Sequence, residues 1–315
     1  MLFAKLNDLS IGGKGSYGIA ASAVERKADL PTYLRITDIF DDGTLNLSEL
    51  KSVDAPNSDK YILKSNDIVF ARTGGSTGRN YFYDGSDGVF VYAGFLIKFS
   101  IDPEKVNPKY VKYYCRSKQY NDWVQSFNTG STRGNINAQT FGNMEIPLPD
   151  RKQQDYLVSI LEPIDEKIKN NKQVNDNLEQ QAQSYFQELF VDNASPEWTT
   201  GTISDLGTVV GGSTPSKAKP EYYTESGIAW ITPKDLSINK SKFVSHGEND
   251  ITELGLKNSS AAIMPEGTVL FSSRAPIGYT AIAAGEVTTN QGFKSVVPKP
   301  EIGTPFVYFF LKQYG

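Results

Sequence analysis

The amino-acid sequence predicts an α+β protein in which two homologous β-rich domains are joined by a long coiled-coil helix, the second copy being truncated. Three observations lead to this fold class. Short motifs return in the same order about 200 residues later, β-branched and aromatic runs alternate with turn residues, and a glycine-free middle segment has apolar residues at helical spacing. We expect a first domain over residues 1–150, the helix over 151–192 and an incomplete second domain over 193–315.

Five ordered matches make up the internal repeat. They pair residues 6–13 with 203–212, 34–39 with 229–236, 63–70 with 264–271, 94–95 with 292–293 (Phe95 with Phe293), and 107–110 with 304–307. Chance similarity of short apolar strings rarely keeps such an order, so we expect two copies of one domain. The second copy is expected to lack everything equivalent to residues 119–192, because the sequence stops at Gly315.

Within each copy the pattern is β-rich and the helices come late. Short runs such as Ile68–Ala71, Val89–Tyr92 and Phe95–Phe99 are rich in β-branched and aromatic residues and are separated by Gly, Asp and Asn, as is typical of strands between turns. Pro108 suits the first turn of a helix through Cys115, and residues 119–127 favour a second helix.

The middle segment predicts a coiled-coil helix. Steps of four and three residues link a seam of ten positions: Leu157, Leu161, Ile164, Ile168, Asn171, Asn175, Leu178, Ala182, Tyr185 and Leu189. Buried Asn residues in such a seam cost stability but fix the register of the partner helix. Pro163 is expected to divide the segment into a short helix near 151–161 and a long one near 163–190, since proline suits a helix start and breaks an interior.

Composition excludes several classes of function. The chain has one cysteine and one histidine, which leaves no set of ligands for a structural zinc site and no His-based catalytic pair. No stretch reaches the ~18 apolar residues of a membrane helix, and the start is unlike a signal peptide, so we expect a cytoplasmic protein without membrane contact. A net charge of −4 gives no global attraction to phosphate, so nucleic-acid binding would need local basic clusters.

Several motifs in this order resemble those of a known family. GGSTPS stands at 211–216, NDIVFARTG at 66–74, GSTRGNIN at 130–137, and IPLP at 146–149 leads into the helix. Together with the duplication, they resemble the specificity subunits of type I restriction-modification systems. The run from Gly130 to Ile168 is specific to that family, although RKQQ at 151–154 replaces the usual Pro-x-x-Glu-Gln. The resemblance covers the entire chain.

The resemblance implies a fold, a function and partners. Members of the family have two target-recognition domains, each reading one half of a split double-stranded DNA sequence. An antiparallel pair of helices holds the domains apart and docks methyltransferase (modification) subunits, and through them the restriction subunit. A helix of some 28 residues would span about 42 Å, which suits two half-sites about one 34 Å turn apart.

Candidate DNA contacts lie in glycine-flanked polar loops, where guanidinium and hydroxyl groups can reach phosphates or guanine edges. In the first copy they are Arg72, Thr73, Ser76, Thr77, Arg79, Arg133, Asn135 and Asn137. In the second copy they are Lys234, Arg274, Gln291 and Lys294, with Arg274 in the loop equivalent to that of Arg72. Tyr17 could flank the groove, but exposed tyrosines are common and a plain surface role is favoured for it. Solvated hairpin loops remain the alternative for all of these residues.

No catalytic constellation is found. The sequence has no NPPY-type methyltransferase motif and no GxGxxG loop, and GGKGS at 12–16 lacks the end of a phosphate loop, so neither an enzyme nor a cofactor is expected. Asp38 and Asp235, which match between the copies, are interpreted as turn or cap residues, and Cys115 as a core residue. One alternative is a fused restriction-methylation enzyme, which would need a cofactor pocket. A non-DNA β-rich binding module on a coiled-coil stalk is the other alternative.

The seam leads to one further expectation. Its intramolecular partner, the helix of the second copy, is absent from this sequence, so the apolar stripe would be an association surface. We expect a homodimer through residues 163–190, with the helices antiparallel and a twofold axis between Asn171 and Asn175. A helix folded back on its own domains, or one that meets a separate subunit, is the alternative.

Overall fold

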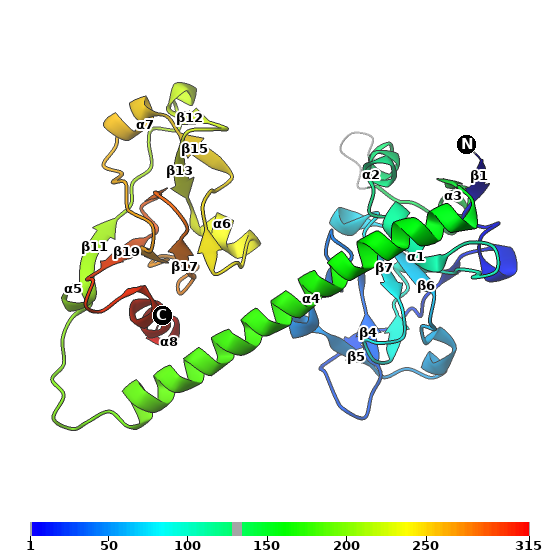
Figure 1. Ribbon diagram of the computed structural model, residues 1–315, viewed down its shortest axis with the longest axis horizontal. Coiled ribbons are helices and arrows are strands. Elements are labelled where there is room, and N and C mark those ends of the chain that lie inside the picture. The colour runs from blue at the N-terminus through cyan, green and yellow to red at the C-terminus, as the bar shows by residue number, and fades with distance from the viewer. Residues whose placement is uncertain (1, 128–133, 315) are drawn as a thin grey trace. The chain divides into compact units, whose positions relative to one another are not determined.

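The computed structural model describes residues 2–127 and 134–314 and divides into two compact units, Met1–Asn170 and Asn171–Gly315 (Figure 1). The first part of the long helix α4 (Arg151–Gln187) belongs to the first unit, and its last part belongs to the second. A π-helical turn, Glu188–Asp192, follows α4. Within the described ranges, no helix is both long and apolar enough to cross a membrane.

The first unit contains two four-stranded sheets and a small two-stranded one. The strand orders are β2-β9-β6-β7 and β3-β5-β4-β8, and β1 pairs with β10. Strands β4 and β8 are parallel, whereas β6 is antiparallel to both of its neighbours. The bounds are β1 Phe3–Lys5, β2 Ser16–Tyr17, β3 Ala23–Val24, β4 Thr32–Leu34, β5 Lys51–Val53, β6 Asp67–Ala71, β7 Asn80–Tyr83, β8 Phe90–Tyr92, β9 Leu96–Ser100 and β10 Glu145–Pro147.

Three short helices, α1 (Pro108–Tyr114), α2 (Lys118–Gln125) and α3 (Ala138–Gly142), follow the sheets. The side chain of Asn107 accepts a hydrogen bond from the Lys109 amide (3.0 Å), and Pro108 occupies the first helical turn, where its missing N–H costs nothing. The predicted start of this helix is therefore confirmed.

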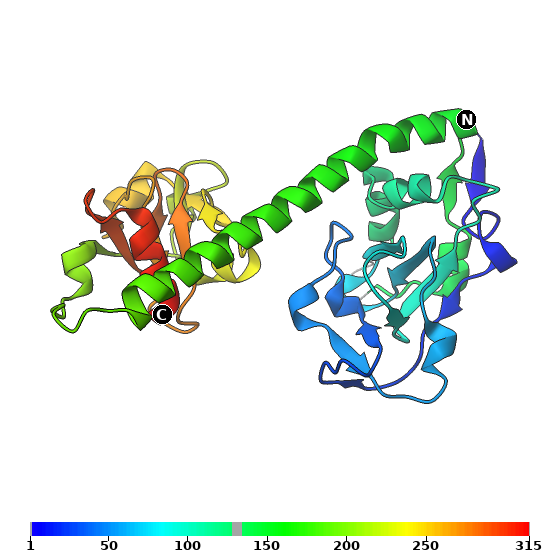
Figure 2. The same cartoon turned by 60° about the horizontal axis from the view of Figure 1, so that its bottom comes forward.

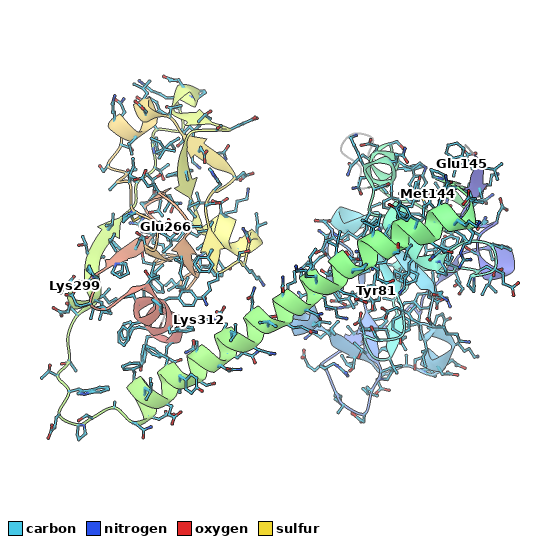
Figure 3. The ribbon with its side chains drawn as sticks, in the orientation of Figure 1. Tyr81, Met144, Glu145, Glu266, Lys299 and Lys312 are labelled. Atoms are coloured by element: carbon cyan, nitrogen blue, oxygen red, sulfur yellow. The ribbon has the colours of Figure 1, made fainter. Side chains whose placement is uncertain are left out.

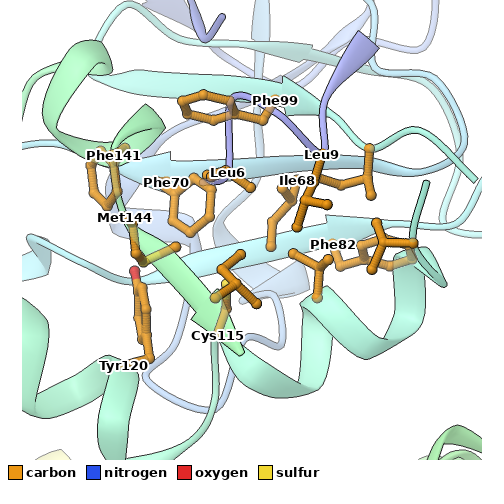
Figure 4. Packing of buried hydrophobic residues seen from close by; sticks show 14 of the residues in the cluster. Leu6, Leu9, Ile68, Phe70, Phe82, Phe99, Cys115, Tyr120, Phe141 and Met144 are labelled. Carbon is orange, nitrogen blue, oxygen red and sulfur yellow. The ribbon is translucent and has the colours of Figure 1, made fainter. Parts of the chain in front are cut away.

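Sheet, helices and the start of α4 enclose the main core of the first unit (Figure 4). Phe70 on β6 lies at its centre, with its ring stacked on Phe141 of α3 at 4.7 Å between centroids and its edge against Phe99 of β9. Cys115 is buried in the same cluster, and burial raises the pKa of its thiol well above the ordinary value. The interpretation of Cys115 as a core residue is confirmed.

Truncating Phe70 to Ala is expected to destabilise the first unit by about 3–5 kcal/mol, because the transfer free energy of the ring is lost and a cavity remains. Denaturant unfolding with hydrogen exchange measured on peptides from each unit is the test, and only the first unit should open earlier. Phe40→Ala, at a half-exposed ring of the same unit, is the control and should change little. Equal losses from the two variants would show that the Phe70 cluster is not the core.

The second unit repeats the order of the two four-stranded sheets, with β14 added at the edge of one of them. Its strand orders are β11-β19-β16-β17-β14 and β12-β15-β13-β18, and β13 is parallel to β18 as β4 is to β8. The bounds are α5 Ile203–Leu206, β11 Gly207–Gly211, β12 Tyr223–Thr224, β13 Ile228–Ile231, α6 Pro233–Ile238, β14 Phe243–Val244, β15 Asn249–Ile251, α7 Glu253–Lys257, β16 Val269–Phe271, β17 Thr280–Ala283, β18 Thr288–Thr289, β19 Lys294–Pro298 and α8 Thr304–Tyr314. The predicted α+β fold with two β-rich regions around a long helix is confirmed.

The strand register corrects one match of the repeat by one residue. Leu96 pairs with Ala71, and Phe293 forms a bridge with Ser272 at the corresponding place in the second unit. Leu96 and Phe293 are both fully buried, whereas Phe95 is 60% exposed. The counterpart of Phe293 is therefore Leu96 and not Phe95, because successive residues of a strand point to opposite faces.

Helix α4 is continuous through Pro163, so the predicted division into two helices is wrong. A proline removes a single amide donor from the helix ladder. Tertiary contacts on both sides of it, with Val158 in the core and Asp165 bound to α1, keep the two turns aligned. Sequence periodicity alone does not reveal such contacts.

Candidate nucleic-acid interface

Two loops of the first unit that are distant in sequence meet at one end of its central sheet. The loop after β6 forms an antiparallel bridge between Thr73 and Asn135, and the Ile136 amide donates to the Arg72 carbonyl oxygen (2.9 Å). The Thr77 hydroxyl donates to the Gly134 carbonyl oxygen at 2.9 Å. These bonds fix both loops as one surface. Arg133, a further candidate, lies outside the described residues.

Arg72 is the cationic centre of this surface. Its guanidinium carbon lies 5.1 Å from the centroid of the Tyr17 ring, a cation–π arrangement, and Nη2 is 3.5 Å from Oδ1 of Asn135. Its Nε is buried without a hydrogen-bond partner among the described residues, and no carboxylate pairs with the group there. The guanidinium is thus held by stacking, while most of its donors remain available to a phosphate or a guanine edge.

Tyr17 was expected to be a plain surface residue, yet it supports Arg72 and is tied to the second loop. Its hydroxyl accepts a hydrogen bond from the Ala138 amide (3.1 Å), at the start of α3. Tyr17 lies on β2, far from both loops in sequence, and reaches them because β2 is the neighbour of β9 in the sheet. No local sequence signal distinguishes this tyrosine from the other tyrosines of the chain.

Of three other candidates in the first unit, two have structural partners and one is buried. Arg79 pairs with Asp41 (2.7 Å) and donates to the Ile39 carbonyl oxygen. Ser76 is buried. Asn137 caps α3 by accepting a hydrogen bond from the Thr140 amide. The structure therefore brings Arg72, Thr73, Thr77 and Asn135 together and occupies the side chains of Arg79 and Asn137 elsewhere.

The corresponding loop of the second unit has the same backbone frame. Gly78 donates to the Ala71 carbonyl oxygen, and Gly278 donates to that of Ser272, at 2.9 and 3.0 Å. In the first unit the Arg72 amide donates to the Phe95 carbonyl oxygen. In the second unit the Ser273 amide donates to the Gly292 carbonyl oxygen in the same way. Arg274 lies in this loop, is exposed and has no hydrogen bond or ion pair within the described part of the chain.

The turn between β18 and β19 adjoins this loop. Gln291 accepts a hydrogen bond from Thr214, which belongs to the GGSTPS loop, and the Ser213 amide donates to the Thr289 carbonyl oxygen (2.9 Å). Lys294 begins β19 opposite Gly211 and is exposed. Arg274, Gln291 and Lys294 therefore lie on neighbouring segments at one end of the sheet formed by β11, β19 and β16.

Lys234 is bound to a carboxylate. Its Nζ lies 2.6 Å from Glu248, and this hydrogen bond and charge raise the pKa of Lys234 above its ordinary value. The helix that carries it, α6, begins with a capping box in which Asp235 accepts hydrogen bonds from Thr232, and Asp38 has the same role towards Arg35 in the first unit. The interpretation of the two matched aspartates as cap residues is confirmed.

The predicted seam of α4 is mostly exposed. Six of its residues have exposed fractions between 37% and 62%: Leu157, Ile164, Ile168, Leu178, Tyr185 and Leu189. Asn171 and Asn175 are exposed as well, whereas Leu161 is half-buried and Ala182 packs against the core of the second unit. The stripe is therefore largely uncovered in the single chain.

No group of three or more metal-ligating side chains occurs among residues 2–127 and 134–314.

Comparison with known proteins gives a consistent result. The family model for the type I restriction modification DNA specificity domain matches residues 25–180 and 196–314. The chain is 44% identical over 127 residues to the type I restriction enzyme MjaIX specificity subunit of Methanocaldococcus jannaschii. These aligned residues make up 40% of this chain and 29% of that protein. It is 22% identical to the type I restriction enzyme HindI specificity subunit of Haemophilus influenzae, across 95% of this chain and 82% of that protein.

A solved structure shares the fold. The crystal structure of a type I restriction-modification system S subunit from M. genitalium has a TM-score of 0.54 at 17% identity and covers 99% of this chain and 76% of that one. At that identity the likeness concerns the fold alone. The chain spans less than a third of the first relative and most of the second.

Proposed function

Because the chain belongs to the family of type I restriction modification DNA specificity domains, we propose that it is the DNA specificity subunit of a type I restriction-modification complex. The domains at 1–150 and 193–315 would each read one half of a bipartite DNA site. The helix over 151–192 would set the distance between the halves and dock methyltransferase subunits, through which the restriction subunit is reached. The chain itself contributes recognition and no catalytic step.

One observation carries this proposal: the two units place an arginine in equivalent loops with the same backbone frame. Arg72 follows β6 and Arg274 follows β16, and neither has a carboxylate partner among the described residues. Arginine without a counter-ion at a rigid loop is suited to bidentate contact with guanine or phosphate. Two such loops in one chain fit a site with two halves.

Charge supports a local mode of binding. With a net charge of −4, the chain alone has no long-range attraction to DNA, so its affinity would depend on the few free cations at the loops and on the partner subunits. We therefore expect tight binding only in complex with methyltransferase subunits, and a weak salt dependence for the chain alone.

We also propose that the chain self-associates through residues 163–190 as an antiparallel pair. The exposed stripe of α4 supports this, since burial of a Leu or Ile side chain contributes about 1.5–3 kcal/mol. Asn171 and Asn175, both exposed, can satisfy each other's amides across a twofold axis. A dimer of this kind would give each α4 an antiparallel partner.

Selection from random-sequence DNA tests the proposed function. The chain, assembled with methyltransferase subunits, should enrich a site of two short specified segments separated by an unspecified spacer of fixed length. Enrichment of a single uninterrupted segment would contradict the two-half assignment. Absence of any enriched sequence would favour the alternative, a β-rich binding module for a ligand other than DNA.

Arg274→Ala is expected to relax the specificity of one half-site only. Loss of a bidentate contact should reduce discrimination at one base pair by about 1–3 kcal/mol, with the other half unchanged. Competition binding with single-base variants of the selected site measures this. Lys299→Ala, at the opposite end of β19, is the matched control and should leave both halves unchanged (Figure 3). Equal relaxation in both halves would remove Arg274 from base readout.

A further inference from the structure

In the first unit, a single carboxylate of α4 collects three donors from one recognition-domain segment. Asp165 Oδ2 accepts hydrogen bonds from Lys112 Nζ (2.8 Å), Tyr113 Oη (3.2 Å) and Arg116 Nη1 (3.1 Å). Lys112 and Tyr113 belong to α1, and Arg116 follows its end. The side chain of Asp165 is only 33% exposed, so these bonds are partly shielded from water.

The second unit holds a carboxylate of α4 in a similar way. Glu179 accepts hydrogen bonds from Tyr308 Oη (2.9 Å) and from Lys312 Nζ, both on α8, and Lys242 Nζ lies 3.5 Å from its other oxygen. The side chain of Glu179 is 25% exposed. Both ribbon views place α8 beside the last turns of α4, where Figure 3 labels Lys312 (Figures 1 to 3).

The two contacts use similar positions relative to the buried face of each helix. Val111 of α1 and Val307 of α8 are both fully buried, and Cys115 and Leu311, four residues further on, are buried as well. Each of these residues is followed by a donor to α4: Lys112 and Arg116 in the first unit, Tyr308 and Lys312 in the second. In both units, donors four residues apart, on one helical face, meet one carboxylate.

Hydrogen bonds and ion pairs are directional, so they can define a position along α4 that apolar contacts alone do not define. Val158 and Phe186 bury α4 against the two units, but apolar burial is non-directional and tolerates sliding and rotation. A carboxylate with two or three charged or hydroxyl donors has a narrow preferred geometry. The acid therefore adds a directional contact between α4 and each unit.

The protonation state agrees with this arrangement. Burial acts to raise the pKa of Asp165, but the hydrogen bond from Lys112 and the charges of Lys112 and Arg116 outweigh it and lower the pKa. Burial also acts to raise the pKa of Glu179, but the hydrogen bonds from Lys312 and Tyr308 outweigh it and lower the pKa. A lowered pKa in the folded chain means that the stabilisation is present above pH ~4 and is lost as the pH falls further.

We propose that Asp165 and Glu179 are positioning residues, one for each recognition unit, which fix the register of the units on α4 and thereby determine the spacer length of the DNA site. This inference rests on the proposed function, since it concerns how accurately two half-sites are kept apart. It predicts that the two acids act on spacer selectivity and not on base readout.

The test measures spacer selectivity in the assembled complex. Wild type and the isosteric variants Asp165→Asn and Glu179→Gln are assayed on DNAs that carry the selected half-sites with spacers shortened or lengthened by one base pair. Wild type should lose at least about tenfold in affinity off the preferred spacer, and the variants less than about threefold, with affinity for the preferred spacer nearly unchanged. The controls Glu166→Gln and Asp176→Asn, exposed positions of the same helix, should keep the wild-type profile.

Two results would overturn the proposal. One is an unchanged spacer profile in the Asp165→Asn and Glu179→Gln double variant. The other is an equal loss of affinity on every spacer, which is the behaviour of a merely stabilising ion pair. Asp165→Glu and Glu179→Asp, which keep the charge but move it by one methylene, add a second readout and should broaden or shift the profile while folding is preserved.

A readout without DNA separates this proposal from the proposed function. Amide exchange in α1 should rise in Asp165→Asn, and in α8 in Glu179→Gln, each without a change in the other helix. If wild type binds no bipartite DNA, the proposed function fails whatever the exchange result. If wild type binds as proposed while exchange and spacer profile of both variants match wild type, the positioning role alone fails.

Discussion

Leu178→Asp is expected to convert a self-associated chain into a monomer at roughly tens of micromolar. Leu178 lies in the middle of the exposed stripe of α4, between Asn175 and Ala182 in the seam. In a symmetric pair the substitution acts twice, so the loss of about 1.5–3 kcal/mol per side chain becomes about 3–6 kcal/mol. This corresponds to a weakening of the dimer by roughly 10²- to 10⁴-fold, before the repulsion between the new carboxylates is counted.

Sedimentation equilibrium of the isolated chain measures this directly. Gln173→Asp is the matched control, because it places the same charge on an exposed position of α4 outside the stripe, and it should leave the dimer intact. A wild-type chain that is monomeric at these concentrations would show that the stripe is not a self-association interface. A dimer that survives Leu178→Asp would place the interface elsewhere.

Arg72→Ala is expected to weaken DNA binding by the complex and to identify what the loop contacts. If the guanidinium reads a guanine, discrimination at one base pair of one half-site falls by about 1–3 kcal/mol, and the salt dependence hardly changes. If it contacts a phosphate, affinity falls on all sequences, and the salt slope decreases by about one unit. Arg133→Ala, combined with Arg72→Ala, should add to either effect.

Binding titrations at several salt concentrations, on the selected site and its single-base variants, distinguish the two outcomes. Arg151→Ala is the control, since this arginine is exposed at the start of α4 and pairs with Asp155. Tyr17→Ala should reproduce part of the Arg72 effect by removing the ring that supports the guanidinium. Unchanged affinity and specificity in the Arg72 and Arg133 double variant would remove both loops from the DNA site.

Much of the candidate site followed from the sequence, because the loops are flanked by glycines and follow apolar strands. What the sequence lacked was the partner of each side chain. Arg72 and Arg79 look alike in one polar loop, yet Arg79 is paired with Asp41, whereas Arg72 is stacked on Tyr17. Both partners lie on segments distant along the chain. Tyr17 is brought to the loop by sheet order, because β2 is the neighbour of β9.

The duplicated architecture and the helix between the copies are predicted by the amino-acid sequence alone. Repeated turn residues and apolar spacing are local properties, and burial of one apolar face selects strands and helix in each copy. Tertiary structure alone decided three points: the continuity of α4 through Pro163, the choice of Leu96 over Phe95 as the counterpart of Phe293, and the binding of Asp165 and Glu179 to α1 and α8. Each depends on contacts between distant residues, whose free energy no local pattern records.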